Sequence, residues 1–191
     1  MSLLEDYRTD LVRTLTARSR RILDRPEKRI AAVLVPLVQV DEAPHLLFIR
    51  RAMTLPHHQG QIAFPGGTHR LGDADLVDTA LREAQEEIGL DPTNVSVLGI
   101  LDDHETMGSG FVITPVVGLI SHPQGWRPAP AEVDAIFTVP VRVLRADGVE
   151  RQELWDFGRH RHPVDLYDVQ GHIIWGATHR ITKSLLALLP S

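Results

Sequence analysis

The sequence predicts an α/β fold in which a mixed β-sheet is flanked by helices. Short apolar runs rich in β-branched residues alternate along the chain with amphipathic segments whose apolar positions follow a helical period. The length of 191 residues and the 43% hydrophobic composition are enough for one domain with a substantial core. We expect an N-terminal helical extension over residues 1–25 and one main domain over residues 26–191.

The first part of the chain is expected to form a leading helix and a buried hairpin. Residues 2–24 place apolar side chains at helical spacings among many charges, and Pro26 follows as a stop signal. Two apolar runs come next, Ile30 to Val40 and Leu46 to Ile49, separated by the turn-prone residues 41–44. We interpret these runs as two strands of one hairpin.

The segment from Leu76 to Ile88 is the best-defined helix in the sequence. Its apolar residues recur with the period of an α-helix, and Gly89 stands where a C-terminal cap is expected. Val95 to Leu101 and Phe111 to Leu119 follow as predicted strands, joined by a polar, glycine-rich loop.

The last third of the chain is predicted to hold a second hairpin between two helices. Ala131 to Ile136 is expected to form a short helix before the apolar segment Val139 to Leu144. Val164 to Val169 and His172 to Trp175 are predicted to pair as a hairpin, and Ala177 to Leu189 is predicted to be the closing helix.

Composition limits the classes of partner. The 20 basic and 25 acidic residues give a formal charge of −5, so the chain carries no basic footprint of the kind that binds a polynucleotide. Cysteine is absent, which leaves oxygen and imidazole groups as metal ligands. The sequence shows no signal-like segment and no apolar stretch of about 20 residues, so we expect a cytoplasmic protein without a membrane partner. A homo-oligomer is compatible with the sequence.

Three glutamates of the amphipathic helix that precedes the capping glycine are the first candidate site residues. Residues three and four apart share a helix face, so Glu83, Glu86 and Glu87 are expected to converge on one patch. Like charges repel unless a cation neutralises them, and Mg²⁺ or Mn²⁺ prefers such oxygen ligands. A solvated acidic face is the alternative. The upstream pair Gly66 and Gly67 favours the metal site, because glycines let the backbone approach a phosphate or metal closely.

The segment from Gly67 to Leu90 resembles the Nudix box, the signature of hydrolases that act on nucleoside diphosphates linked to another group. The resemblance is carried by Arg82-Glu83-Ala84-Gln85-Glu86-Glu87-Ile88-Gly89-Leu90. It implies a Nudix-like α/β/α sandwich, in which Glu83 and Glu87 would bind Mg²⁺ or Mn²⁺ together with a backbone oxygen near Gly67. It also implies that Glu86 would hold a second ion or act on water, and that Arg82 would orient Glu83 by a charge-assisted hydrogen bond.

The first half of the box departs from the family pattern. Counting back from Arg82 puts Thr68 and Ala74 where the usual box has its first glycine and its first glutamate. The loop is therefore one residue longer than usual. Asp73 or Asp75 is expected to take the place of that glutamate, which leaves a fourth acidic metal ligand open.

Residues outside the box indicate the substrate. Arg51-Ala52 followed by residues 60–67 resembles an additional signature of the coenzyme A pyrophosphatase subfamily, although Pro56 stands where a basic residue is usual. The late segment Ile174 to Thr178 is similar to that subfamily as well. The resemblance implies that the phosphates of coenzyme A bind beside the metal site. The candidate substrate-binding residues are Arg50, Arg51, His57, Gly66 and Gly67.

The activity that the resemblance implies is metal-dependent hydrolysis of coenzyme A, or of its oxidised or acylated forms, to 3′-phospho-AMP and 4′-phosphopantetheine. Activation of the attacking water is assigned first to Glu86, with Glu105 and Glu132 as alternatives. ADP-ribose, a dinucleoside polyphosphate or another nucleoside diphosphate derivative is the alternative substrate. A non-catalytic ligand sensor is a further alternative, which the intact set of three glutamates disfavours.

Overall fold

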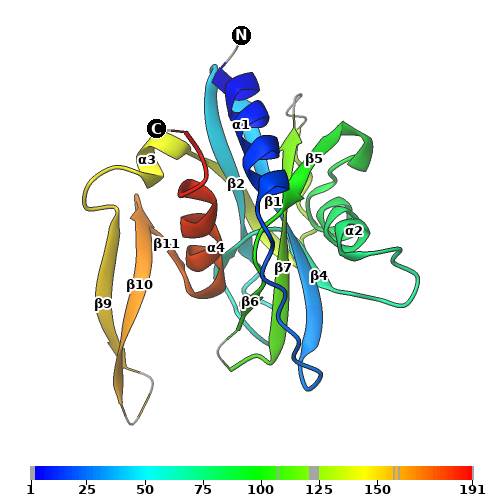
Figure 1. Cartoon of the computed structure of the whole chain (residues 1–191). Helices are drawn as coiled ribbons and strands as arrows, with labels where there is room; N and C mark the ends of the chain where they lie inside the picture. The colour runs from blue at the N-terminus through cyan, green and yellow to red at the C-terminus, as the bar shows by residue number, and fades with distance from the viewer. Residues whose placement is uncertain (1–2, 107, 121–124, 157, 159, 191) are drawn as a thin grey trace.

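The computed structural model describes residues 3–106, 108–120, 125–156, 158 and 160–190. Within these residues the main body is an eight-stranded mixed sheet between two layers of helices (Figure 1). Helix α2 (Leu76–Ile88) covers one face, and α1 (Leu3–Ala17) and α4 (Gly176–Leu186) cover the other. The predicted α/β/α sandwich with a mixed sheet is therefore confirmed.

The sheet is organised around β1 (Arg29–Val40), whose long apolar run is buried on both faces. It pairs antiparallel with β2 (Ala43–Arg51), as the predicted hairpin requires, and parallel with β7 (Phe111–Ile120). The short strand β4 (Gly66–Thr68) lies antiparallel along the first half of β1. The remaining strands of this sheet are β3 (Ile62–Ala63), β5 (Val95–Ile100), β6 (His104–Glu105) and β8 (Val133–Pro140).

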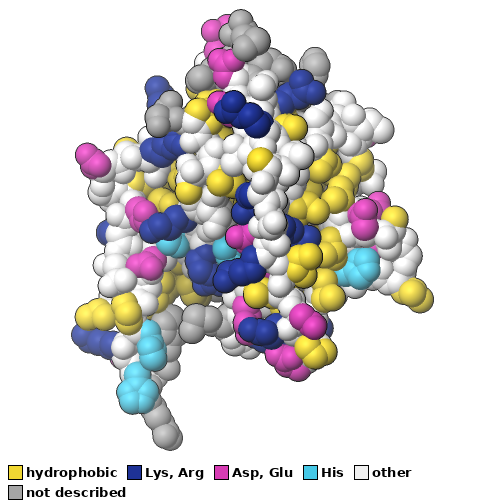
Figure 2. Space-filling view, viewed as in Figure 1, with side chains coloured by type: hydrophobic (Ala, Val, Ile, Leu, Met, Phe, Trp, Pro, Cys, Tyr) yellow, Lys and Arg dark blue, Asp and Glu magenta, His cyan; other side chains and the backbone are white. Residues whose placement is uncertain are grey.

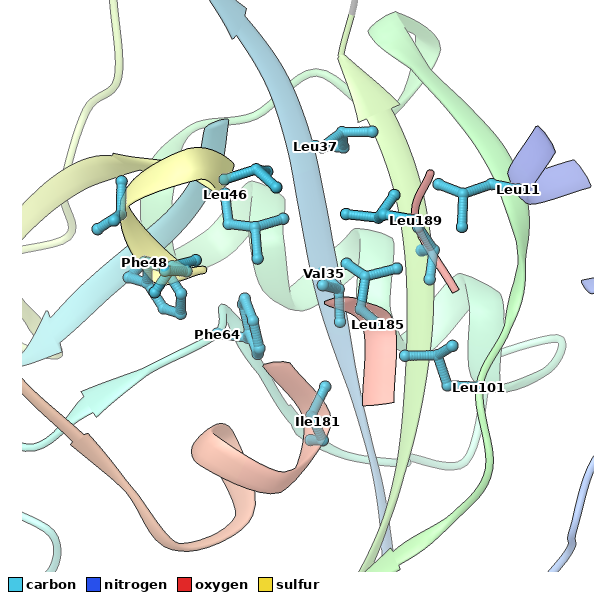
Figure 3. Close-up of a cluster of buried hydrophobic side chains, with 14 of the residues drawn as sticks. Leu11, Val35, Leu37, Leu46, Phe48, Phe64, Leu101, Ile181, Leu185 and Leu189 are labelled. Carbon is cyan, nitrogen blue, oxygen red and sulfur yellow. The ribbon is translucent and has the colours of Figure 1, made fainter. Parts of the chain in front are cut away.

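Two hydrophobic clusters hold the layers together. The larger cluster lies between the sheet and the helices α1 and α4, and Figure 3 shows its side chains from β1, β2 and both helices, including Val35, Leu46, Leu11 and Leu185. The second cluster lies between the sheet and α2. The sheet is thus covered on both sides, and α2 packs directly against it.

A three-stranded antiparallel sheet follows the main body. It contains β9 (Glu150–Asp156), β10 (Arg161–Val169) and β11 (His172–Trp175), and the β9–β10 hairpin projects from the body in Figure 1. The predicted pairing of Val164 to Val169 with His172 to Trp175 is confirmed. The short helical turn α3 (Val141–Leu144) connects β8 to β9, and η1 (Pro92–Asn94) connects α2 to β5. In the described part of the chain, no helix is both long and apolar enough to span a membrane.

The leading helix ends earlier than the sequence suggests. A helix was expected over residues 2–24, whereas α1 ends at Ala17. The residues after it form hydrogen bonds with two acids of a distant loop. The carboxylate of Asp102 accepts one from the backbone N–H of Arg21, and that of Asp103 accepts one from the backbone N–H of Leu23, both at 2.9 Å. These tertiary bonds replace the helical bonds that local periodicity predicts.

The predicted helix from Ala131 to Ile136 is wrong. Residues 130–132 form a turn, and the chain then enters β8, which pairs antiparallel with β2 over its whole length. Val139 and Pro140 end this strand, and only residues 141–144 turn into α3. The β-branched and aromatic residues of the segment suit a strand, and the open edge of β2 supplies the hydrogen-bond partners that decide the outcome.

The N-terminal helix shares the larger core. Leu11 is fully buried and Leu15 is 8% exposed, and both belong to the cluster that contains β1 and α4 side chains. Leu15 lies so close to Gly99 of β5 that a Cβ at Gly99 would come within 2.9 Å of it. That residues 1–25 form an extension and residues 26–191 the main domain stays a prediction from the sequence.

Candidate active site

Helix α2 carries the candidate metal ligands and is well defined at both ends. The carboxylate of Asp75 caps its N-terminus by accepting a hydrogen bond of 2.8 Å from the backbone N–H of Asp78. Gly89 ends the helix with φ +67°, a left-handed conformation that favours glycine. The buried face consists of small and apolar residues together with Glu83 and Glu87. The helix thus turns two carboxylates towards the sheet.

Glu86 does not join this buried pair. Each residue of an α-helix is rotated by about 100°, which puts Glu87 about 40° from Glu83 but Glu86 about 60° to the other side. Glu83 is 5% exposed and Glu87 is 2% exposed, whereas Glu86 faces solvent. Among the described residues, no three Asp, Glu or His side chains are grouped as a ready set of metal ligands. The three carboxylates therefore do not converge on one patch as expected. Glu83 and Glu87 form a buried pair, and Glu86 lies apart from them on the exposed side of the helix.

Strand β4 brings two glycines against this pair. The backbone N–H of Gly66 donates a hydrogen bond of 2.9 Å to Oε2 of Glu87. At Gly67 a Cβ would lie 2.6 Å from the carboxylate carbon of Glu83, so a larger residue would displace that carboxylate. Because β4 pairs with β1 while α2 packs on the same region of the sheet, the glycine pair and the carboxylates lie in direct contact.

Arg82 ties the carboxylates to the loop before the helix. Its Nε and Nη2 donate to the two carboxylate oxygens of Asp73 at 2.7 and 3.0 Å, and its Nη1 donates to Oε1 of Glu83 at 2.7 Å. Nη1 also reaches Glu86 at 3.2 Å, and Nη2 reaches the backbone oxygen of Thr68 at 3.2 Å. The guanidinium therefore links the carboxylate of Glu83 to Asp73 in the loop before the helix.

Asp73 faces Arg82 and not the buried pair. Hydrogen bonds from Arg82, from the backbone N–H of Arg70 and from Thr79 lower the pKa of Asp73 well below its ordinary value. With both carboxylate oxygens engaged in this way, Asp73 serves as the partner that holds Arg82. The structure thus gives Asp73 a positioning role in the loop before the helix.

Arg70 is a site residue that the sequence reasoning missed. Its guanidinium lies 3.4 Å from Glu83 and donates hydrogen bonds of 3.3 Å to both oxygens of Glu86. It stands in the irregular loop between β4 and α2, where no periodicity indicates the direction of a side chain. Its position within the box was the only sequence signal that pointed to it.

The environment of Glu87 is unfavourable for a negative charge. Burial raises the pKa of Glu87 to about 8, and the nearby carboxylates of Glu83 and Glu132 act in the same direction. The N–H of Gly66 and the positive charge of Arg51 oppose this shift only in part. A hard cation beside Glu83 and Glu87 would remove the penalty, and Mg²⁺ is commonly held by one or two carboxylates with substrate phosphates completing its shell. The residues present therefore fit Mg²⁺ or Mn²⁺.

Arg51 and Glu132 come to this site from distant parts of the sequence. Backbone pairing between Arg51 in β2 and Val133 in β8 puts Glu132 beside the end of β2, and both side chains influence Glu87 electrostatically. The Nε of Arg51 is buried and has no hydrogen-bond partner. A buried guanidinium nitrogen without a partner indicates a place where an anionic group can bind.

The other predicted substrate residues are less closely associated with the carboxylates. Arg50 is exposed on β2, next to an irregularity in the pairing with β8, and His57 is exposed in the loop that leads to β3. Hydrogen bonds link neither side chain to Glu83 or Glu87 within the described residues.

Glu105 is not brought to the carboxylate pair. Its strand β6 is the neighbour of β7, which pairs with β1, and β1 in turn carries β4. Three strand spacings amount to about 14 Å between β6 and β4. The carboxylate of Glu105 forms ion pairs with Lys28 and Arg25 instead, and these lower its pKa.

Comparisons with known proteins agree with this geometry. A model of the NUDIX domain matches residues 28–157. Two relatives carry the name uncharacterized Nudix hydrolase NudL. The protein of Pectobacterium atrosepticum is 42% identical over 161 residues, which cover 83% of this chain and 82% of the relative. The protein of Salmonella paratyphi B is 37% identical over 169 residues, which cover 83% and 81%.

Solved structures share the fold at low sequence identity. A NUDIX hydrolase from Alicyclobacillus acidocaldarius superposes with a TM-score of 0.57 at 22% identity, covering 84% of this chain and 91% of its own. The Nudix hydrolase RenU from M. Smegmatis gives a TM-score of 0.52 at 21% identity, covering 62% and 74%. By its matched residues, its relatives and its carboxylate pair, the chain belongs to the Nudix family and is a pyrophosphohydrolase that acts on nucleoside diphosphate derivatives.

Proposed function

We propose that this Nudix hydrolase cleaves the pyrophosphate bond of coenzyme A, or of its oxidised or acylated forms, to 3′-phospho-AMP and 4′-phosphopantetheine. The observation that carries the proposal is the position of Arg51. This arginine begins the segment that resembles the coenzyme A pyrophosphatase signature, and its charge acts on Glu87 of the Nudix box. The segment that indicates the substrate thus adjoins the carboxylates that indicate the reaction.

Glu83 and Glu87 would hold Mg²⁺ or Mn²⁺ together with the backbone near Gly67. The ion would neutralise charge on the diphosphate oxygens and lower the pKa of a bound water. Arg82 keeps Glu83 in place through its bonds to Glu83 and Asp73. Arg51 donates to a phosphate oxygen through the nitrogen that has no partner inside the protein.

We assign activation of the attacking water to Glu132 in preference to Glu86. Support for Glu132 comes from its proximity to Glu87 and from its carboxylate, for which no hydrogen-bond partner exists in the described part of the structure. Both oxygens of Glu86, the first choice from sequence, already accept hydrogen bonds from arginines. A free carboxylate can accept a proton from water without first losing a guanidinium partner.

The test is to incubate the protein with coenzyme A and Mg²⁺ or Mn²⁺ and to identify the products by chromatography. We expect 3′-phospho-AMP and 4′-phosphopantetheine in equal amounts. A panel with ADP-ribose and a dinucleoside polyphosphate measures kcat/KM for the alternative substrates. The assignment fails if one of these is cleaved efficiently while coenzyme A is not.

The same assay addresses the identity of the base. We expect Glu132→Gln to lower kcat strongly with little change in KM, and Glu86→Gln to have the smaller effect on kcat. The reverse order would return the role to Glu86. Binding of a diphosphate without hydrolysis of any member of the panel would instead indicate a ligand sensor.

A further inference from the structure

A second group of basic side chains lies on the face of the sheet opposite to Glu83 and Glu87. In the antiparallel ladder of β6 and β7, His104 is paired with Ile113, which packs against the core beneath α1 and α4, and paired residues point to the same face. Arg21 of the connector after α1 and Arg180 of α4 are bonded to the two residues that flank His104 in the chain: the backbone N–H of Asp103 donates to the backbone oxygen of Arg21 at 3.0 Å, and Arg180 donates to the backbone oxygen of Glu105. Figure 2 shows Lys and Arg side chains gathered on this face, between α4 and the connector.

Arg180 is a half-buried cation without a carboxylate partner among the described residues. Its Nη2 donates a hydrogen bond of 2.7 Å to the backbone oxygen of Glu105, and no ion pair involving its guanidinium occurs among the described residues. Burial lowers its pKa, and no acid opposes that shift. A guanidinium has five N–H donors, so most of its capacity for hydrogen bonds remains unused.

The imidazole of His104 is also incompletely satisfied. Its Nε2 is buried and has no hydrogen-bond partner, which is rare for a buried polar atom. Burial, followed by the positive charges of Arg180 and Arg21, lowers the pKa of His104 to about 4, and Asp102 and Asp103 only partly oppose this. The positive charge around this ring thus exceeds what the nearby acids neutralise.

The acids of this region are already paired with other cations. The pairs are Asp102 with Arg18, Asp103 with Arg20, and Glu105 with Lys28 and Arg25. Asp103 additionally accepts hydrogen bonds from Thr114 and from the backbone N–H of Leu23. The guanidinium groups of Arg21 and Arg180 therefore keep their charge available for an external anion.

We propose that His104, Arg21 and Arg180 form a binding site for a phosphate group, separate from the metal site. Two guanidinium forks and one imidazole N–H provide the charge-assisted hydrogen bonds that phosphate oxygens accept. The site lies across the sheet from Glu83 and about three strand spacings, or roughly 14 Å, from β4. It cannot hold the diphosphate that is cleaved, and it takes either a remote phosphate of the substrate or a free phosphate-bearing ligand.

The direct test uses inorganic phosphate as the probe and the full chain without added metal. Binding is measured by titration calorimetry, and the imidazole resonance of His104 is followed by NMR, with His104→Gln to assign it. We expect one saturable site whose occupation shifts the His104 resonance. The absence of saturable binding, or binding that leaves this resonance unchanged, overturns the proposal.

Variants show whether the arginines form the site. Arg180→Gln is expected to weaken phosphate binding about tenfold or more, since a hydrogen bond to a charged group is lost. Arg21→Gln, at an exposed position, is the second variant and is expected to weaken binding without unfolding the chain. Arg142→Gln removes the same charge from the exposed face of α3 and should leave affinity unchanged. Unchanged affinity in both Arg180→Gln and Arg21→Gln would refute the site.

A kinetic comparison distinguishes the two sources of phosphate, and this arm rests on the proposed function. KM is measured for coenzyme A and for 3′-dephospho-coenzyme A with the wild type and with Arg180→Gln. A rise in KM for coenzyme A alone identifies the substrate's own phosphate as the ligand. If the KM for each compound is the same in the wild type and in Arg180→Gln, the ligand of this site is a free phosphate-bearing molecule. If neither compound is cleaved while Arg180-dependent phosphate binding persists, the proposed function fails and the phosphate site stands.

Discussion

Glu87 is a carboxylate in a place where its negative charge is unfavourable without a cation. It is 2% exposed, it lies near Glu83 and Glu132, and its pKa is raised to about 8, mainly by burial. The N–H of Gly66 supplies one hydrogen bond. The residue is therefore poised for a divalent ion, because metal binding replaces the proton that burial favours.

The stability of the metal-free protein is expected to fall with rising pH because of Glu87. Its pKa in the folded chain, about 8, lies above the ordinary value of 4.5, so folding favours the protonated form. This contribution to stability is fully present below about pH 4.5 and is lost as pH rises through about 8. Against Glu87→Gln, which stays neutral, the wild type should lose roughly 3 to 5 kcal/mol between these limits.

Denaturant unfolding of both proteins from pH 4 to 9 in the presence of a chelator measures this difference. The comparison cancels the titration of groups that the two proteins share. Parallel stability curves would contradict the assigned environment of Glu87. Added Mg²⁺ should restore stability to the wild type at high pH and have a smaller effect on Glu87→Gln.

Removing either buried carboxylate is expected to abolish most of the activity while the fold persists. Glu83→Gln and Glu87→Gln keep the side-chain volume but remove a charged metal ligand, so turnover should fall about 100-fold or more. Gln85→Ala is the matched control, since Gln85 is exposed on the same helix. Turnover and circular dichroism are measured together. Near-normal turnover in both glutamate variants would remove these residues from the site.

At the scale of elements, the site depends on the contact between β4 and α2. The strand approaches the helix so closely that only glycine fits beside Glu83. Asp73 and Arg82 connect the loop between these elements to the helix by two hydrogen bonds. The loop, the strand and the helix therefore act as one unit that fixes the position of the Glu83 carboxylate.

Gly67→Ala is expected to lower metal affinity and turnover more than it lowers stability. The added Cβ would meet the end of a flexible side chain, 2.6 Å from the carboxylate carbon of Glu83, so the carboxylate shifts and the backbone stays in place. Calorimetric Mn²⁺ binding, turnover and thermal unfolding are compared with Gly125→Ala, at which a Cβ meets nothing within 4 Å. Wild-type Mn²⁺ affinity in Gly67→Ala would contradict this close approach.

The elements also differ in how far they could be predicted. The limits of α2, from Leu76 to Ile88, were predicted correctly because its apolar period and its C-terminal glycine are both local signals. The segment that became β8 was predicted as a helix, because its pairing partner β2 lies more than 80 residues earlier in the chain. Local patterns determine a helix more completely than they determine a strand.

At the scale of the whole molecule, the N-terminal helix contributes to the stability of the sandwich although it lies outside the residues that match the NUDIX domain model. The NUDIX domain model begins at residue 28, yet α1 contributes Tyr7, Leu11 and Leu15 to the larger core. The connector after α1 then bonds to Asp102 and Asp103, next to β6. The same segment thus supports the sheet and delivers Arg21 to the proposed phosphate site.

Leu11→Ala is expected to destabilise the whole protein by about 3 kcal/mol, as for a fully buried leucine in a well-packed core. Val12→Ala, at a position that is 40% exposed on the same helix, should cost well under 1 kcal/mol. Denaturant midpoints of both variants provide the measurement. Equal, small effects would show that α1 is not part of the cooperative core.

The reaction class followed from sequence because its signals are local. Helical spacing grouped Glu83, Glu86 and Glu87, and residues 82–90 carry the resemblance to the Nudix box that implies the reaction. Even within this helix, however, burial was needed to separate Glu86 from the pair. Sequence could not show that Asp73 would bind Arg82 and not a metal, because a loop has no period that orients its side chains.

Tertiary structure alone decided which distant residues meet. Arg51 and Glu132 come together beside Glu87 because β2 and β8 pair in one particular register. Glu105 is kept away from Glu83 and Glu87 because β7 and β1 lie between β6 and β4. The same strand order brings His104 near Arg180. Strand pairing joins segments that are far apart in the chain, so these neighbours depend on the packing of the whole molecule and on no local pattern.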